Sequence, residues 1–361
     1  MDFARAINLF KSDKIAELAE TPAGLRFLKL RSLSRKEHLE ELFRTANITA
    51  TETSASALLK RAVESTISDN VIDATIATIF QRESAARIAN EPQLVNELYK
   101  MEVFDWGGLH QNSLEKTIVD NYVKKITSFE TLESKIENEL QQSMRGFVLC
   151  QWYNHWTSII IEDVFNSHRR VVPAVGKIKK IDFFVDDVPF DLKVTYLPEG
   201  FIKERRKADK LKPELTLARL AAKALKIVFD DGLPDGKLLE DLLKKLKDHP
   251  NDLAQALVKN LHAYRMSLLG KVQADPEELI IWLYENQGIR RFDSGNRLFL
   301  VLVDASAFFD SWKLKRAKPL LEDRIGRFVD GLPTPPGRKV SFNWEGTNFE
   351  CRSDVCFVVK P

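Results

Sequence analysis

The sequence has few cysteines and no long uninterrupted apolar run. These two absences limit the classes of protein to which the chain can belong. Only Cys150, Cys351 and Cys356 occur in 361 residues, without the paired spacing of a zinc site. We therefore expect a reduced protein without a disulfide framework. No apolar run reaches the ~20 residues that span a bilayer, and the first residues lack the apolar stretch of a signal peptide. These features favour a cytoplasmic protein with no membrane partner.

The chain also lacks a large excess of charge of either sign, with a net charge of +2. A protein that coats nucleic acid would be far more basic, so a nucleic-acid role must rest on local charge. Residues 169–212 carry twelve Lys or Arg against seven Asp or Glu. Candidate phosphate contacts in this segment are Lys177, Lys179, Lys180, Lys203, Arg205, Arg206 and Lys207. The alternative is an ordinary solvated surface.

The pattern of apolar residues divides the chain in two. Residues 1–142 are predicted to be a helical domain for recognition or dimerisation, because apolar positions recur at intervals of three and four. Residues 143–361 mix helices with strands, which predicts a mixed α/β domain with a helical insertion at about 205–290. Strands are predicted in the β-rich stretch after residue 170 and at 297–304, 339–344 and 355–359, and a helix at 311–331 with a possible break at Pro319.

A predicted β-hairpin at residues 181–195 carries the most informative chemistry. Two β-branched and aromatic runs flank Asp186 and Asp187, which are acceptable turn residues. With these two residues as the loop, Asp182 lies opposite Asp191. Side chains alternate along a strand, so Asp191 and Lys193 share one face. The hairpin therefore sets two carboxylates about 5 Å apart, with a lysine one step further along.

Two directly opposed carboxylates destabilise a hairpin unless a cation neutralises them. Magnesium favours one or two carboxylates plus several waters. It can polarise a phosphoryl oxygen and lower the pKa of its bound water, while Lys193 can orient that water or stabilise charge on phosphorus. The pattern thus predicts Mg²⁺-dependent hydrolysis of phosphodiesters. The competing interpretation is a solvent-facing side of the hairpin on which Lys193 pairs with the acids.

The helix predicted before the hairpin adds a third acid, Glu162. A polar stripe within about 40° of Glu162 contains Gln151, His155, Ser158 and Asn166. Polar groups in an otherwise apolar, buried helix need partners, so Glu162 is a candidate metal ligand. Asp163 points about 100° away and is the weaker candidate. A buried structural hydrogen-bond network is an equal alternative, and His155 is expected to be a core histidine.

The order of Glu162 on a helix, Asp182 on a strand and then Asp191-Leu192-Lys193 resembles the PD-(D/E)xK nuclease superfamily. The resemblance covers roughly residues 144–200, and Ile181 stands where the family has a loosely kept proline. It implies a restriction-endonuclease-like fold, with a mixed central sheet between helices. It also implies that Asp182 and Asp191 bind Mg²⁺, that Glu162 is an accessory ligand and that Lys193 serves the attacking water.

The same resemblance favours a type II restriction endonuclease of a restriction-modification system, acting on double-stranded DNA. A homodimer is expected by analogy, because cutting both strands of a symmetric site calls for two sites related by a two-fold axis. A cognate methyltransferase is a further expected partner. Two alternatives stay open: a repair or phage-defence nuclease, and a non-catalytic DNA-binding protein on a nuclease-like fold.

Overall fold

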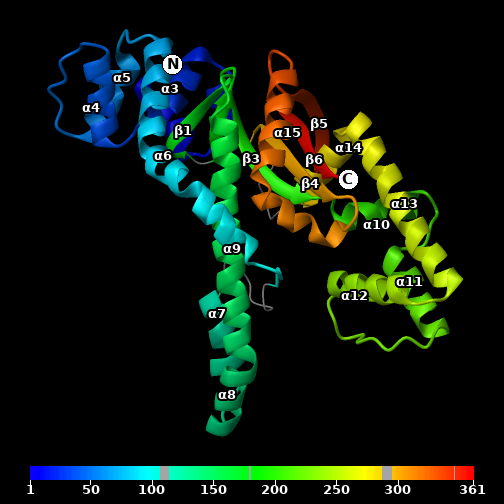
Figure 1. The fold of residues 1–361 in the computed structure, drawn as a ribbon. Helices are drawn as coiled ribbons and strands as arrows, with labels where there is room; N and C mark the ends of the chain where they lie inside the picture. The colour runs from blue at the N-terminus through cyan, green and yellow to red at the C-terminus, as the bar shows by residue number, and fades with distance from the viewer. Residues whose placement is uncertain (106–113, 179, 287–294, 345) are drawn as a thin grey trace.

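A computed structural model describes residues 1–105, 114–178, 180–286, 295–344 and 346–361. At its centre is a six-stranded sheet in the order β1-β2-β3-β4-β6-β5 (Figure 1). The strands are β1 (Val171–Ile178), β2 (Ile181–Val185), β3 (Val188–Tyr196), β4 (Arg297–Asp304), β5 (Arg338–Trp344) and β6 (Thr347–Lys360). The pairs β3–β4 and β4–β6 are parallel and the other three antiparallel. The prediction of a mixed α/β architecture is confirmed.

The central strand β4 is buried along all eight of its residues. Its near-continuous apolar sequence suits a parallel strand covered on both faces. The predicted strand at 297–304 is confirmed, and the one at 339–344 begins one residue earlier in the structure. Strand β6 is longer than the predicted 355–359, because its first half pairs with β5 in an antiparallel ladder through polar residues that lack an apolar pattern.

Six helices form the first part of the chain, up to Tyr99. They are α1 (Phe3–Lys11), α2 (Ile15–Ala19), α3 (Pro22–Ser32), α4 (Lys36–Thr45), α5 (Ala55–Glu64) and α6 (Asp69–Tyr99). The side chains of Asp2, Thr21 and Ser54 cap three of them by accepting backbone N–H groups. These helices bury Val172 of β1 and Phe184 of β2 in shared apolar clusters, so they cover one end of the sheet (Figure 1).

A long helical arm follows. It comprises α7 (Leu114–Ile118), the π-helical turn η1 (Val119–Val123), α8 (Phe129–Lys135), a second π-helical turn η2 (Ile136–Leu140) and α9 (Gln141–Asn166). From Phe129 to Asn166 these elements follow without a break, so the predicted boundary at 142/143 falls inside one continuous helix (Figure 1). Only the second half of α9 packs on the sheet. The expectation that the whole helix is buried is wrong, since Val148 in its first half is 58% exposed.

Helices between β3 and β4 form the predicted insertion. They are α10 (Glu199–Ala208), α11 (Glu214–Ala224), α12 (Asp235–Asp248), α13 (Asp252–Ala274) and α14 (Glu277–Asn286). After β4, the 3-10 helix η4 (Phe308–Arg316) and α15 (Lys318–Gly331) are separated at Ala317, which confirms the break near Pro319. The three cysteines are free. No helix in the described part is both long and apolar enough to cross a membrane.

Candidate functional site

The β2–β3 hairpin has the predicted register. Val185 pairs with Val188 across a two-residue turn, and both turn residues have positive φ, 41° for Asp186 and 68° for Asp187. Positive φ at both positions is the conformation of a type I′ turn, which matches the twist of the flanking strands. Phe183 pairs with Phe190, so continuing the ladder by one residue sets Asp182 opposite Asp191.

Asp182 is held by the backbone of the facing strand. The amide of Leu192 donates a hydrogen bond of 2.7 Å to Oδ2 of Asp182. Burial raises the pKa of Asp182, and the carboxylate of Asp191 raises it further, against the lowering effects of the Leu192 amide and of Lys193. The carboxylates of these two aspartates therefore repel each other when both are ionised.

Asp191 is buried between two cations. Nζ of Lys193 lies 2.5 Å from its Oδ1, and Nε of Arg297 lies 3.4 Å from its Oδ2. Arg297 is the first residue of β4 and pairs with Asp191 in the parallel register, 1% exposed and stacked over the ring of Tyr284. Sequence reasoning missed Arg297, because the register between two strands a hundred residues apart is a tertiary property.

Glu162 on α9 is close enough to respond electrostatically to the hairpin acids. Burial and, after it, the charge of Asp182 raise the pKa of Glu162 to about 7, although Lys193 acts in the opposite direction. The structure therefore brings Asp182, Asp191 and Lys193 together on the hairpin, and Glu162 lies near enough for its pKa to respond to the charges of Asp182 and Lys193.

The neighbouring acid on the helix serves another contact. Asp163 is buried and accepts two hydrogen bonds from Arg87 of α6, at 2.6 and 2.9 Å. Its carboxylate is therefore engaged by α6, which agrees with its place as the weaker candidate for a metal ligand. His155, by contrast, is exposed near the middle of α9, so the expectation of a core histidine is wrong.

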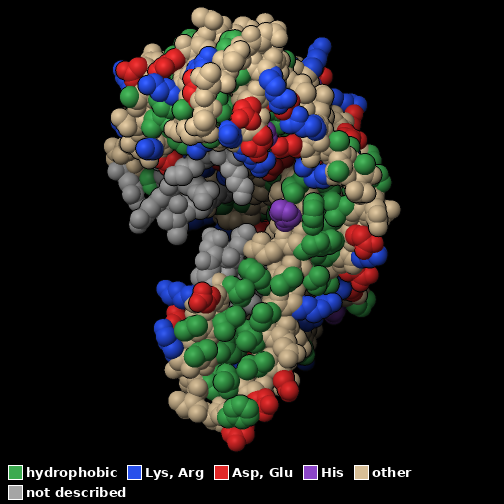
Figure 2. All heavy atoms as spheres, turned by 90° about the vertical axis from the view of Figure 1, so that its left-hand side faces the viewer, with side chains coloured by type: hydrophobic (Ala, Val, Ile, Leu, Met, Phe, Trp, Pro, Cys, Tyr) green, Lys and Arg blue, Asp and Glu red, His purple; other side chains and the backbone are tan. Residues whose placement is uncertain are grey.

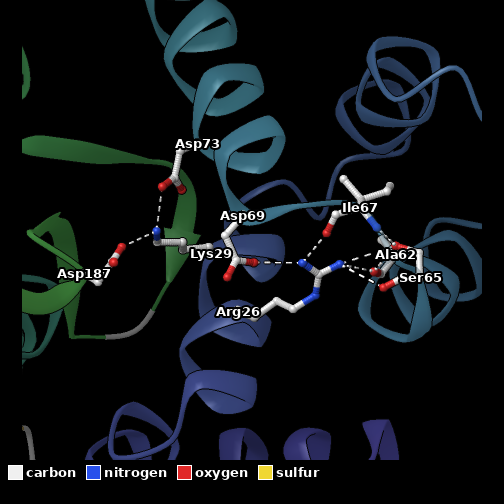
Figure 3. A network of polar contacts seen from close by, with 8 residues as sticks. All are labelled: Arg26, Lys29, Ala62, Ser65, Ile67, Asp69, Asp73 and Asp187. Carbon is white, nitrogen blue, oxygen red and sulfur yellow. Dashed lines mark hydrogen bonds and ion pairs between the residues drawn. The ribbon is translucent and has the colours of Figure 1, made fainter.

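A buried lysine from the N-terminal helices fixes the turn of the hairpin (Figure 3). Nζ of Lys29 on α3 lies 2.8 Å from Asp73 of α6 and 2.5 Å from Asp187 in the turn. Lys29 is only 2% exposed. Its two acidic partners raise the pKa of Lys29, although burial acts in the opposite direction. One charged side chain thus links the turn of the hairpin to α3 and α6. No local feature of the sequence predicts this contact.

The donor set suits one Mg²⁺ with retained waters better than a closed protein cage. Among the described residues, no three His, Cys, Asp or Glu side chains are arranged as a ready metal site. Magnesium needs only one or two carboxylates, and the mutually repelling pair of Asp182 and Asp191 offers them. Metal binding there would exchange the Lys193–Asp191 ion pair for coordination.

The residues predicted to contact DNA differ in their exposure and in the ion pairs that they already form. Lys203 and Lys207 are exposed on α10. Arg205 forms an ion pair with Glu278, and Lys180 pairs with Asp13 at 2.6 Å.

Arg206 must be withdrawn from the candidate contacts. It is buried, donates to the carbonyl of Lys212 at 2.9 Å and stacks over Tyr264, because it closes the end of α10. Lys179 and the side chain of Lys177 lie outside the described residues.

A cavity of about 630 Å³ opens at the end of β3, beyond Lys193. Its lining includes Thr195 and Trp312 and carries six Asp or Glu against three Lys or Arg. This excess of acids makes the cavity unsuitable for a phosphate backbone.

Comparisons of the chain with protein-family models, curated proteins and solved structures gave no match.

Proposed function

We propose that this chain is a Mg²⁺-dependent nuclease that hydrolyses phosphodiester bonds of DNA at the hairpin site. The observation that carries the proposal is the meeting of Asp182, Asp191 and Lys193 on one hairpin, with Glu162 approaching from α9. Two neighbouring carboxylates that could hold a cation, a third acid on α9 and one lysine are groups that suit a metal-assisted attack on a phosphodiester.

Each residue has a distinct role in the proposal. Asp182 and Asp191 would hold the cation, which when bound would polarise a phosphoryl oxygen and lower the pKa of a water. Glu162 is the accessory ligand. Lys193 leaves Asp191 when the substrate arrives and places its ammonium group against the phosphate, where it stabilises the charge that develops on phosphorus. Arg297 keeps Asp191 oriented from the neighbouring strand.

The finer assignment is a type II restriction endonuclease of a restriction-modification system, acting on double-stranded DNA as a homodimer beside a cognate methyltransferase. Support comes from the sequence resemblance over residues 144–200. A repair or phage-defence nuclease would use the same chemistry. Discrete fragments from plasmid DNA would favour a restriction enzyme, whereas a smear would favour a general nuclease.

The experiment is cleavage of supercoiled plasmid by the purified full chain, with Mg²⁺ and with EDTA. Asp191→Ala and Lys193→Ala should each abolish the Mg²⁺-dependent cleavage. The matched control is Lys360→Ala, because Lys360 forms a similar ion pair of 2.7 Å with the buried Asp304, across β4 and β6. The control should cut like the unchanged protein. Undiminished cleavage by both hairpin variants would show that the hairpin is not the active site.

A second candidate is a non-catalytic DNA-binding protein on a nuclease-like fold. The observation that favours it is the double pairing of Asp191 with Lys193 and Arg297, which already neutralises one acid without metal. Plasmid that binds the protein but stays uncut in Mg²⁺ and in Mn²⁺ would decide for this alternative.

A further inference from the structure

The 3-10 helix η4 carries Lys315, a lysine without an acidic partner in the described part of the chain. Its ammonium group donates one hydrogen bond, of 2.8 Å, to the neutral Oδ1 of Asn154 on α9. Burial lowers the pKa of Lys315 to about 8, and no neighbouring acid contributes to the shift. A charge that is removed from water without a counterion costs free energy, so Lys315 destabilises the fold unless an anion binds there.

Three other buried cations show that the fold usually supplies such a counterion. Lys29 contacts two aspartates, Arg265 two glutamates and Arg297 one aspartate. The neighbour of Lys315 on β3 adds a donor instead. Nζ of Lys315 lies 5.6 Å from the ring centre of Tyr196, whose buried hydroxyl has no hydrogen-bond partner among the described residues. Burial raises the pKa of this hydroxyl, so it keeps its proton and remains a donor.

The two neighbours of Lys315 belong to the elements that carry the proposed active site. Asn154 precedes Glu162 by eight residues on α9, which is about 12 Å at ~1.5 Å per residue. Tyr196 follows Lys193 by three residues on β3, which is about 10 Å at ~3.3 Å per residue. The two estimates agree, and at ~3.4 Å per nucleotide along a duplex axis they correspond to about three nucleotides.

A polar stripe on α9 joins Lys315 to the site. Asn154, Ser158 and Glu162 recur at every fourth residue, which sets them along one side of the helix, and all three are partly exposed. Towards the start of α9 the large apolar side chains of Val148 and Leu149 are exposed instead. In Figure 2 hydrophobic side chains gather over the lower lobe, whereas charged side chains dominate the visible face above it. A negatively charged strand would therefore find its polar contacts between Asn154 and the hairpin.

We propose that Lys315 binds a second phosphate of the nucleic-acid strand that is cut at the hairpin, about three nucleotides from the scissile bond. Asn154 positions the ammonium group for this contact. The inference rests on the proposed function, because it takes the hairpin acids as the place of cleavage. A phosphate brings both negative charge and several acceptor oxygens, which the donors around Lys315 lack. The strand ends short of the acid-lined cavity, whose acids form no ion pair with Lys315 and do not shift its pKa.

The first test measures binding without cleavage, by the fluorescence anisotropy of a labelled DNA duplex in EDTA at several salt concentrations. Lys315→Met removes the charge and should weaken binding by about tenfold and reduce the log–log salt slope by about 0.9. Lys315→Arg should restore most of the affinity. Lys313→Met is the matched control on η4, because Lys313 already pairs with Asp310 at 2.9 Å, and it should bind like the unchanged protein. An unchanged affinity and slope in Lys315→Met would overturn the proposal.

Thermal unfolding separates a phosphate contact from a structural role. Lys315→Met removes a charge that has no counterion, so its melting temperature should rise or stay the same. Lys29→Met, which removes the shared partner of two aspartates, should melt at a lower temperature. A marked fall in the melting temperature of Lys315→Met would identify Lys315 as a structural residue and contradict the proposal.

A titration with inorganic phosphate distinguishes a strand from a small anion. Inorganic phosphate that binds through Lys315, together with duplex binding that does not depend on Lys315, would overturn the assignment to a strand. The readouts in EDTA need no catalysis, so this contact and the proposed function fail separately. Duplex binding through Lys315 without any cleavage in Mg²⁺ would refute the nuclease and keep the contact. Cleavage by a chain whose binding ignores Lys315 would do the reverse.

Discussion

At the scale of the residue, Glu162 couples the site to pH. Its pKa is raised from 4.5 to about 7 by burial and by the charge of Asp182. The folded protein therefore holds a proton that the unfolded chain releases above pH 4.5, so stability falls as the pH rises from 4.5 towards 7. The full cost above pH 7 is about 3 kcal/mol.

Glu162→Gln removes this titration. In EDTA, the free energy of unfolding of the unchanged protein should fall between pH 5 and pH 7.5, and that of Glu162→Gln should fall less. Urea titrations at a series of pH values measure both curves. Asp163→Asn does not serve as a control, because it breaks the buried ion pair with Arg87. It should therefore lower the free energy of unfolding at every one of these pH values. Parallel curves for Glu162→Gln and the unchanged protein would contradict the prediction.

Lys193 competes with a metal ion for Asp191. Lys193→Met removes the ammonium group that lies 2.5 Å from Oδ1, so we expect Mg²⁺ or Mn²⁺ to bind at least as tightly as in the unchanged protein. Cleavage should nevertheless be lost. Isothermal titration with Mn²⁺ and plasmid cleavage measure the two effects. Asp182→Ala should lose both metal binding and cleavage. A Lys193→Met variant that loses metal affinity would mean that the lysine organises the site instead of competing for it.

At the scale of the element, the β2–β3 hairpin depends on α3 for its position. Lys29→Met leaves Asp73 and Asp187 without their shared cation, which should lower the free energy of unfolding by about 2 kcal/mol. Amide exchange in the turn at 186–187 should quicken. Arg26→Met is the control, since the hydrogen bonds of Arg26 to Asp69, Ser65 and nearby backbone carbonyls all lie within the N-terminal helices (Figure 3). Equal exchange in the turn of both variants would refute the tether.

Helix α10 carries two kinds of basic residue, the exposed Lys203 and Lys207 and the buried Arg206. Lys203→Ala with Lys207→Ala should weaken DNA binding and flatten its dependence on salt, because fewer counterions are released. Arg206→Ala should instead lower the melting temperature, since it removes the hydrogen bond to Lys212 and the stacking on Tyr264. Binding isotherms at several salt concentrations give the slopes. An unchanged slope in the double variant would make α10 an ordinary solvated face.

At the scale of the whole molecule, the N-terminal helices and the sheet share their cores. Ile178, Ile181 and Phe184 of the sheet are buried in a cluster with Leu18 and Phe27. A chain limited to residues 143–361 would expose these side chains, so it should lack a cooperative thermal transition and should aggregate. Near-ultraviolet circular dichroism and sedimentation measure this against the full chain. A well-folded fragment would restore the prediction of two independent domains.

The sequence by itself determined what depends on near neighbours. The alternation in IDFFVDDVPFDLKVT decided the turn at Asp186–Asp187 and the facing of Asp182 and Asp191, because the side-chain period of a strand leaves one register that buries the aromatic residues. Helical periodicity likewise separated Glu162 from Asp163. These interactions span a few residues, so the local pattern contains them.

Only the tertiary structure decided what depends on distant segments. The parallel register places Arg297 on Asp191, and α3 brings Lys29 to the turn. Packing also buried Arg206 and left the beginning of α9, including Met144 and Val148, outside the core. Composition does not predict whether such a side chain is buried or exposed, because the same basic or apolar side chain is stable in either environment when suitable neighbours surround it. Lys29 and Arg297 contact aspartates more than a hundred residues away, and these contacts form only when the chain folds.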